Sequence, residues 1–136
     1  MLFRSIDSVI EKDFETVHPD MTLGDIVKVI TRSGHNTFPV INESGVLLGV
    51  VKLEEIRNIM FRPELYDRFR VSRFMVTFPV RIKISMSMDQ VMRTFDDTNT
   101  WNLPVVDEAG HYMGFVSKSK IFSSYRKVLV DNFLGD

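Results

Sequence analysis

The chain has no cysteine and no long apolar run, and each absence removes a class of function. Because none of its 136 residues is a cysteine, it has no disulfide, no thiolate nucleophile and no cysteine-ligated metal. The longest apolar runs, such as VLLGVV at 46–51, are far shorter than the roughly 20 residues that span a bilayer. We therefore expect no segment of this sequence to cross a membrane.

Net charge is also nearly absent. Lys and Arg number 17 against 18 Asp and Glu, which gives a formal net charge of −1. Such a chain has no general field to hold a polyanion, so nucleic acid is not expected as a partner. Residues 1–14 carry acids throughout and lack a continuous apolar stretch, so they do not resemble a signal peptide. A cytosolic setting fits these features.

Catalytic and metal-binding patterns are missing as well. His18, His35 and His111 are scattered, without a pair at i, i+4 and without a nearby acidic cluster, so no metal site is expected. No Gly-x-Ser-x-Gly, Walker loop or pair of catalytic carboxylates occurs. The sequence therefore predicts a protein that is not an enzyme and requires no cofactor.

What the chain does contain is an internal repeat. Hydrophobic residues make up 44% and charged residues 26%, a composition typical of a globular protein. Residues 37–60 and 102–125 align without a gap at a constant offset of 65 positions. Such a repeat predicts two supersecondary units that bury their apolar faces together. The shared positions are Pro39/Pro104, Val40/Val105, Glu43/Glu108, Gly45/Gly110, Gly49/Gly114, Val51/Val116 and Ile56/Ile121.

A helix is expected ahead of each repeat block. The first begins after Thr22, with Asp25 three residues on as an imperfect capping box, and Gly34 is expected to end it in the left-handed conformation. The second begins after Ser87 and is expected to stop at Asn99, a residue that also tolerates positive φ. An apolar stripe at helical spacing follows each cap.

The blocks themselves predict hairpins and further helices. In each block a short strand is followed by a polar turn ending in glycine and by a second strand. The expected strands are 38–41, 46–51, 103–106 and 111–116; the expected later helices are 53–61 and 118–130; extended segments are expected at 14–19 and 78–84. Each repeat thus reads strand, helix, strand, strand, helix, and Pro63 is expected to prevent the first of these later helices from continuing.

The doubled block h-P-V-h-[DN]-E-x-G-x-h-x-G-h-[VS], each copy behind a capped helix, resembles a pair of cystathionine beta-synthase (CBS) motifs, together a Bateman module. The resemblance implies a mixed α/β (α+β) fold of two β-α-β-β-α motifs packed with pseudo-two-fold symmetry. It implies one CBS pair over 1–136, with motif 1 at 6–61, a linker at 62–73, and motif 2 with an extended C-terminal helix at 74–136.

Residues 101–129 are more narrowly similar to the C-terminal CBS motif of ClC-type bacterial chloride channels and transporters. This implies a regulatory module at the cytoplasmic face of the cell membrane, attached to a transmembrane channel domain and forming a homodimer through its helices. The alternative is a free-standing CBS sensor of a small ligand that regulates a separate cytosolic enzyme.

Members of the family bind adenine nucleotides (ATP, ADP or AMP) between motifs, through a Gly-h-x-[Thr/Ser]-x-x-Asp segment. The acid accepts ribose hydroxyls, and the hydroxyl lies near the phosphates. This chain departs from that pattern in both copies. Lys52 replaces the hydroxyl and Glu55 the acid in the first copy, whereas the second copy keeps Ser117 but has Lys120 in place of the acid.

The resemblance implies two unequal sets of ligand residues. The better equipped set is Lys52 and Glu55 with Arg81, Trp101, Asn102 and Pro104. The other set is Ser117 and Lys120 with Thr16, Asn36, Thr37 and Pro39. Simpler interpretations stay open, because Lys52 and Glu55 fit a solvated helix start and Trp101 fits a packing residue. Because Lys120 stands where the pattern has an acid, two functions remain open to the same degree. One is nucleotide sensing, and the other is a dimerisation scaffold that binds no ligand.

Overall fold

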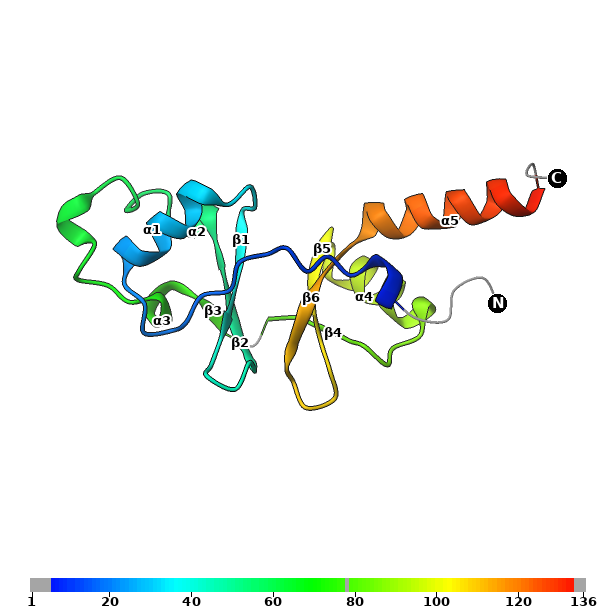
Figure 1. Cartoon of the computed structure of the whole chain (residues 1–136), viewed down its shortest axis with the longest axis horizontal. Coiled ribbons are helices and arrows are strands. Elements are labelled where there is room, and N and C mark those ends of the chain that lie inside the picture. The colour runs from blue at the N-terminus through cyan, green and yellow to red at the C-terminus, as the bar shows by residue number, and fades with distance from the viewer. Residues whose placement is uncertain (1–5, 78, 134–136) are drawn as a thin grey trace. The chain divides into compact units, whose positions relative to one another are not determined.

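The computed structural model describes residues 6–77 and 79–133, and these divide into two compact units (Figure 1). Among them, unit 1 comprises 6–12, 80–109 and 113–133, and unit 2 comprises 13–77, 79 and 110–112. Unit 2 therefore contains the first sequence repeat. Unit 1 contains most of the second repeat and adds a segment from near the start of the chain.

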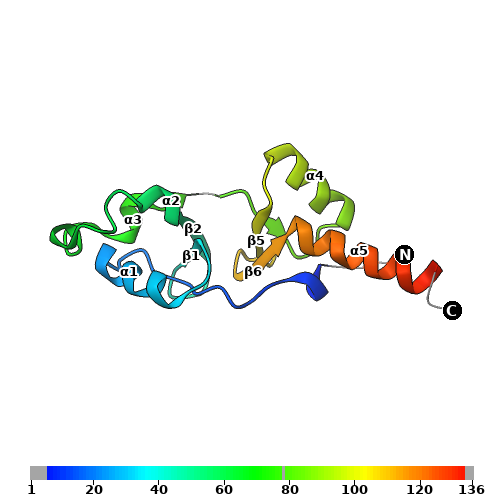
Figure 2. The ribbon, with the colours of Figure 1, turned by 90° about the horizontal axis from the view of Figure 1, so that it is seen from above.

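Unit 2 is built on an antiparallel hairpin. Its sheet has the order β1-β2-β3, with β1 antiparallel to β2 and β2 antiparallel to β3. Figure 2 shows α1 and α2 beside the β1–β2 hairpin. The elements are α1 (Leu23–Arg32), β1 (Thr37–Ile41), β2 (Leu47–Lys52), α2 (Leu53–Ile56), η2 (Pro63–Leu65), α3 (Val71–Phe74) and β3 (Val76–Thr77).

Unit 1 also contains a three-stranded sheet, and its edge strand is parallel to its neighbour. Its sheet has the order β4-β5-β6, and β4 is parallel to β5. The elements are η1 (Asp7–Val9), β4 (Ile82–Lys83), α4 (Met88–Thr98), β5 (Asn102–Val106), β6 (Tyr112–Ser117) and α5 (Lys118–Phe133). The sequence order strand, helix, strand, strand, helix is confirmed for the second repeat. Phe78, in the predicted extended segment 78–84, lies outside the described residues.

Each unit has its own apolar core. In unit 2 the hairpin and α1 bury Phe38, Val40 and Ile26 completely. In unit 1 the corresponding cluster contains Phe95 and Val105, and Ile6 joins it from near the start of the chain. Complete burial of one such side chain contributes about 1.5–3 kcal/mol. The prediction of a mixed α/β fold is confirmed.

The first extended segment is shorter than expected. Within 14–19 only Val17 pairs with the sheet, in a single parallel bridge to Val40. The Val17 N–H donates to the Pro39 carbonyl at 2.9 Å, and the Ile41 N–H donates to the Val17 carbonyl at 2.9 Å. The segment therefore docks on β1 without forming a named strand.

Both helix starts are confirmed, with more complete caps than the sequence suggested. The Thr22 hydroxyl accepts from the Asp25 N–H, and the Asp25 carboxylate accepts from the Thr22 N–H at 3.0 Å, so the capping box is closed on both sides. Ser87 and Gln90 form the same reciprocal box at the start of α4.

The two helix ends differ. Asn99 adopts the left-handed conformation at φ 52°, as expected. The prediction for Gly34 was wrong, since its φ is not positive. Helix α1 instead ends at Ser33, which is extended and donates its N–H to the Val29 and Ile30 carbonyls. Because those bonds already satisfy the last turn, a left-handed residue is not needed there.

The helix predicted at 53–61 was also too long. Helix α2 ends at Ile56, and residues 57–61 continue as turns. The Met60 carbonyl accepts from the Tyr66 hydroxyl at 2.6 Å. Pro63 has no N–H to donate, so the backbone cannot extend the ladder past this point.

The segment predicted as a linker, 62–73, carries structure. Val71 is buried in the unit 2 core, and Leu65, Tyr66 and Phe69 pack against that core. The Val71 N–H donates to the Met21 carbonyl at 2.8 Å. These contacts tie the segment to unit 2.

The Asp25 cap predicts a pH dependence of stability. The hydrogen bond from the Thr22 backbone N–H, more than any other contact, holds the pKa of Asp25 below its ordinary value. Because the folded pKa is depressed, this contribution is complete above the unfolded pKa of about 3.9. It is lost as the pH falls through the folded pKa. We expect Asp25→Ala to lower the free energy of unfolding by about 1 kcal/mol at pH 7, with the difference shrinking between pH 5 and pH 2 in urea titrations.

Gln90→Ala is the matched control, because Gln90 occupies the same capping position in α4 without a charge. Its cost should be the same across that pH range. Identical pH profiles for the two variants would contradict the assignment.

The glycines give a second prediction. Gly114 has φ +146°, and a Cβ there would lie 2.6 Å from the Glu11 carbonyl oxygen. We expect Gly114→Ala to destabilise the chain by about 2 kcal/mol or more. Gly34 is the control, since nothing lies within 4 Å of a Cβ placed there. Gly34→Ala should be neutral or slightly stabilising in thermal unfolding. An equal cost at both positions would show that strain at Gly114 is not the cause.

Candidate functional site

A pocket of about 380 Å³ lies in unit 2 where β1 begins, β2 ends and α2 follows. Its lining residues are Asn36, Thr37, Lys52, Leu53, Glu54, Arg57 and Met60. Asn36, Thr37 and Lys52 belong to the ligand residues predicted from sequence. The sequence had assigned them to two different sets, whereas the structure brings them together within one unit.

The hairpin register explains this meeting. In the antiparallel pair, Thr37 is the register partner of Lys52. One residue further out, the Leu53 N–H donates to the Asn36 carbonyl at 2.9 Å. The open end of the hairpin therefore places the residues before β1 directly beside those after β2.

The turn that follows β2 supplies the remaining wall. Leu53 lies in α2, and Arg57 and Met60 lie in the turns that follow it. All three line the pocket, and Glu54 adds a carboxylate. Glu55, the acid predicted to read a ribose, is exposed but is not among the lining residues.

The polar groups of the pocket are accessible. Lys52, Glu54, Arg57 and Asn36 are exposed, and Thr37 is half-buried. Among residues 6–77 and 79–133, neither Lys52 nor Arg57 has an ion-pair partner. The pocket thus presents two cationic groups, one carboxylate, one amide and one hydroxyl to solvent.

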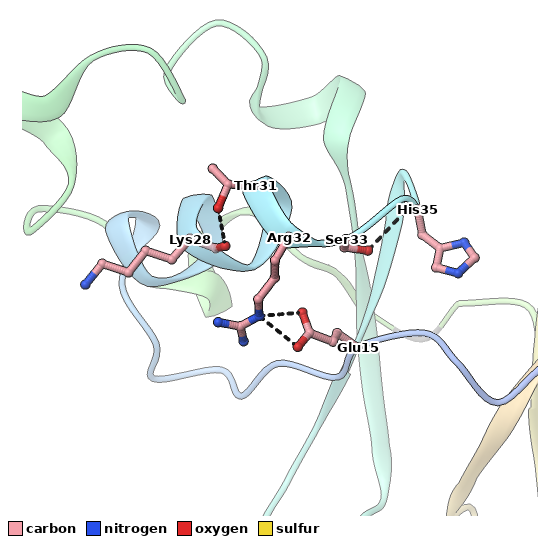
Figure 3. Close-up of polar contacts among 6 residues, drawn as sticks. All are labelled: Glu15, Lys28, Thr31, Arg32, Ser33 and His35. Carbon is pink, nitrogen blue, oxygen red and sulfur yellow. Dashed lines mark hydrogen bonds and ion pairs between the residues drawn. The ribbon is translucent and has the colours of Figure 1, made fainter.

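The loop that leads to Asn36 is held by contacts with the segment before Val17. The Arg32 Nε donates to both carboxylate oxygens of Glu15, at 2.9 and 3.1 Å (Figure 3). The His35 N–H donates to the Ser33 hydroxyl at 3.1 Å. The His35 ring stacks on Phe14 with centroids 3.7 Å apart. These contacts fix the direction in which the chain enters the pocket wall.

The other predicted residues of unit 2 lie elsewhere. Thr16 is exposed on the segment that docks on β1, and Pro39 is buried in β1. Neither lines the pocket. Their predicted contact with a ligand stays a prediction.

Unit 1 holds the remaining predicted residues. Ser117 accepts a hydrogen bond from the Lys120 N–H at 3.1 Å, so its hydroxyl serves the first turn of α5. Lys120 and Asn102 are exposed. Arg81 is half-buried and Pro104 is buried. Their roles toward a ligand likewise stay predictions.

Trp101 is not a core residue. Its side chain is 64% exposed, although the Lys118 ammonium lies 5.2 Å from the ring centroid and pairs with Asp96 at 2.9 Å. The cation covers part of one ring face. Trp101 is therefore an exposed residue with a cation over its ring, and its contact with a ligand stays a prediction.

The repeat offset identifies what unit 1 has in place of the pocket lining. Trp101, Ser117 and Phe122 occupy the positions of Asn36, Lys52 and Arg57. The backbone bond is kept, since the Lys118 N–H donates to the Trp101 carbonyl at 2.8 Å. The hairpin geometry is therefore repeated while the polar chemistry is not.

Tyr125 is a further replacement of a pocket residue, since it stands at the position that Met60 has in unit 2. Burial, and to a lesser degree the charge of Asp89, raises the pKa of the Tyr125 hydroxyl above its ordinary value. The hydroxyl therefore stays neutral at physiological pH. The Phe122 ring packs edge-on against the Tyr125 ring, with the two centroids 6.3 Å apart.

Sequence reasoning missed Leu53, Glu54, Arg57 and Met60. The family pattern directs attention to positions 52 and 55, so these four residues carried no signal in the sequence.

Across the described ranges, every helix is too short or too polar to span a bilayer.

Comparisons with known proteins agree with this architecture. The CBS domain family matches the chain twice, over residues 6–62 and 71–127. The uncharacterized protein MJ0188 of Methanocaldococcus jannaschii is 28% identical over 128 residues, which cover 88% of this chain and 43% of that protein. The chain therefore spans less than half the length of this relative.

Solved structures show the same fold. CBSX2 in complex with AMP superposes with a TM-score of 0.76 at 19% identity, covering 93% of this chain and 98% of the other. The CBS domain pair of MJ0100, in complex with 5′-methylthioadenosine and S-adenosyl-L-methionine, gives a TM-score of 0.71 at 18% identity over 91% and 97%. Two matches to one family together cover most of the sequence, and the chain belongs to the CBS domain family.

Proposed function

We propose that this CBS pair is a regulatory, non-catalytic module that binds an adenine nucleotide at the unit 2 pocket. The observation that carries the proposal is the convergence of Asn36, Thr37 and Lys52 on one pocket. All three belong to the ligand residues that the sequence resemblance implies. Their positions follow from the hairpin register, which is a property of the backbone.

The pocket has the size and chemistry for part of a nucleotide. A volume of about 380 Å³ falls within the range of about 300–1,000 Å³ that is typical of small-molecule sites. Leu53 and Met60 supply apolar contact, and the amide and hydroxyl groups supply hydrogen bonds. Two structures with this fold contain AMP or adenosine derivatives, which supports the same ligand class here.

Regulation requires that the ligand bind two arrangements of the protein unequally. The chain has two compact units, and a ligand bound to one of them could favour one arrangement of the protein over another. The signal would pass to an attached or separate partner, since the proposal assigns no chemical reaction to the chain.

The finer proposal places the module on the cytoplasmic side of a ClC-type chloride channel or transporter, as a homodimer. The sequence of 101–129 is its support. Self-association is further supported by exposed apolar side chains on α5, namely Phe122, Leu129 and Phe133. Several apolar segments of roughly 20 residues encoded just upstream of residue 1 would favour the channel. An upstream region without them would favour the free-standing sensor.

Ligand binding is tested by titrating the purified chain with ATP, ADP, AMP and S-adenosylmethionine in calorimetry and thermal-shift assays. A ligand present at 100 times its dissociation constant should stabilise the folded state by about 2.7 kcal/mol. We expect at least one adenine nucleotide to bind with a micromolar to sub-millimolar dissociation constant. Guanosine triphosphate is the control for base selectivity. If none of the four ligands gives a response at millimolar concentration, nucleotide sensing is excluded and the scaffold function replaces it.

Two adjacent acids allow a sharper test. The family pattern predicts that Glu55 accepts the ribose hydroxyls, whereas the structure places Glu54 in the pocket lining. From the pattern we expect Glu55→Ala to weaken nucleotide binding about tenfold, because a charged acceptor of two hydroxyl donors is lost. Glu54→Ala, a neighbour of the same type and exposure, is the matched comparison. A tenfold loss at Glu54 with none at Glu55 would move the acid role to Glu54.

A further inference from the structure

The pocket cations differ from three other arginines of unit 2, which have partners within the unit. Arg32 pairs with Glu15 at 2.9 Å, and Arg62 pairs with Glu64 at 3.2 Å. The Arg73 guanidinium lies over the Phe69 ring at 5.3 Å. The charges of these three side chains therefore interact with groups inside unit 2.

Lys52 and Arg57 have no such partner within the described ranges. Lys52 precedes the first residue of α2, and Arg57 follows the last. Because both line one pocket of about 380 Å³, their charges act on the same solvent-accessible site. Glu54 offsets one of them, which leaves a net positive pocket at neutral pH.

The two cations have complementary chemistry. Guanidinium presents a planar fork that binds phosphate oxygens in pairs, whereas ammonium acts as a compact point charge. One phosphate can be bound by one of these groups. A chain of two or three phosphates can engage both, with the Thr37 hydroxyl and the Asn36 amide as additional donors.

The arrangement is confined to unit 2. At the equivalent positions unit 1 has Ser117 and Phe122, which carry no charge. Lys118, which follows Ser117, is already paired with Asp96, and Lys120 stands at the position of Glu55 rather than of a pocket cation. The pair of cations at these two positions therefore occurs in the first repeat and not at the equivalent positions of the second.

We propose that Lys52 and Arg57 make the unit 2 pocket selective for the number of phosphates, so that it prefers nucleoside triphosphates and diphosphates over monophosphates and over uncharged adenosine. This inference deepens the proposed nucleotide function and rests on it for the adenosine part of the ligand. The phosphate part stands on the pocket charges and is tested with a probe that has no nucleoside.

The experiment measures dissociation constants of ATP, ADP, AMP, adenosine and sodium tripolyphosphate by calorimetry, in EDTA so that no divalent cation neutralises the phosphates. We expect each phosphate added from AMP to ATP to tighten binding about fivefold, in line with exposed ion pairs. Tripolyphosphate should bind measurably by itself. Raising the salt from 50 to 300 mM should weaken ATP more than AMP, because screening acts on each pair.

Two variants test the assignment directly. Arg57→Gln and Lys52→Thr should each weaken ATP and tripolyphosphate about fivefold to tenfold. Each should weaken AMP by a smaller factor, because the remaining cation can still bind its single phosphate. Lys52→Thr introduces the hydroxyl that the CBS pattern has at this position. It therefore also tests whether that residue gives ATP, ADP and AMP similar dissociation constants. Lys28→Gln is the charge-matched control, because Lys28 is an exposed cation on α1 outside the pocket (Figure 3).

The outcomes separate this inference from the proposed function. Equal affinity for ATP and AMP, unchanged in both pocket variants, overturns phosphate selectivity while nucleotide binding stands. Tripolyphosphate binding that is lost in Arg57→Gln, without any nucleotide preference over it, supports the anion site and overturns the adenosine part. Equal losses in Lys28→Gln would show a general charge effect and would also overturn the assignment. Thermal unfolding of each variant checks that the fold is intact.

Discussion

The antiparallel register of β1 and β2 is the constraint on which the candidate site depends. Pairing Thr37 with Lys52 fixes the position at which the chain leaves β2. Helix α2 begins at the next residue, so this pairing also determines where the pocket residues after β2 lie relative to Asn36 and Thr37. A slip of one residue would reverse the face of every side chain in the strand, and Phe38 and Val51, both buried, hold the register against it.

The repeat preserves this constraint and changes the chemistry placed upon it. Both hairpins turn through a glycine with positive φ, Gly45 in one and Gly110 in the other. Both open ends are closed by the same backbone bond, at 2.9 Å in unit 2 and 2.8 Å in unit 1. The side chains at these ends then diverge into a polar pocket in one copy and an aromatic surface in the other. Fold symmetry and functional asymmetry are thus separate properties of the chain.

The parts of the fold that were predictable from sequence are those set by local rules. The caps at Thr22 and Ser87, the turn glycines and the left-handed Asn99 follow from short-range hydrogen bonding and allowed φ, and all were found as expected. Gly34 and the length of α2 were misjudged. Helix α1 ends where the Ser33 N–H donates to the Val29 and Ile30 carbonyls, and the residues after Ile56 form turns in place of further helix.

The site was only partly predictable for a related reason. Asn36, Thr37 and Lys52 could be named from the family pattern, yet their meeting on one pocket required the hairpin register. Arg57 carries no family signal, and its place in the pocket wall depends on the turns that follow the end of α2 at Ile56. Sequence similarity identifies residue types at aligned positions, whereas the pocket depends on where the folded chain places each of them.

Whether ligand chemistry is concentrated in the first repeat can be measured by following backbone amide chemical shifts during titration with ATP. We expect the largest changes at 36–37 and 52–57, with smaller changes around Ser117 and Lys120. Largest changes at 117–120, or equal changes in both repeats, would contradict it.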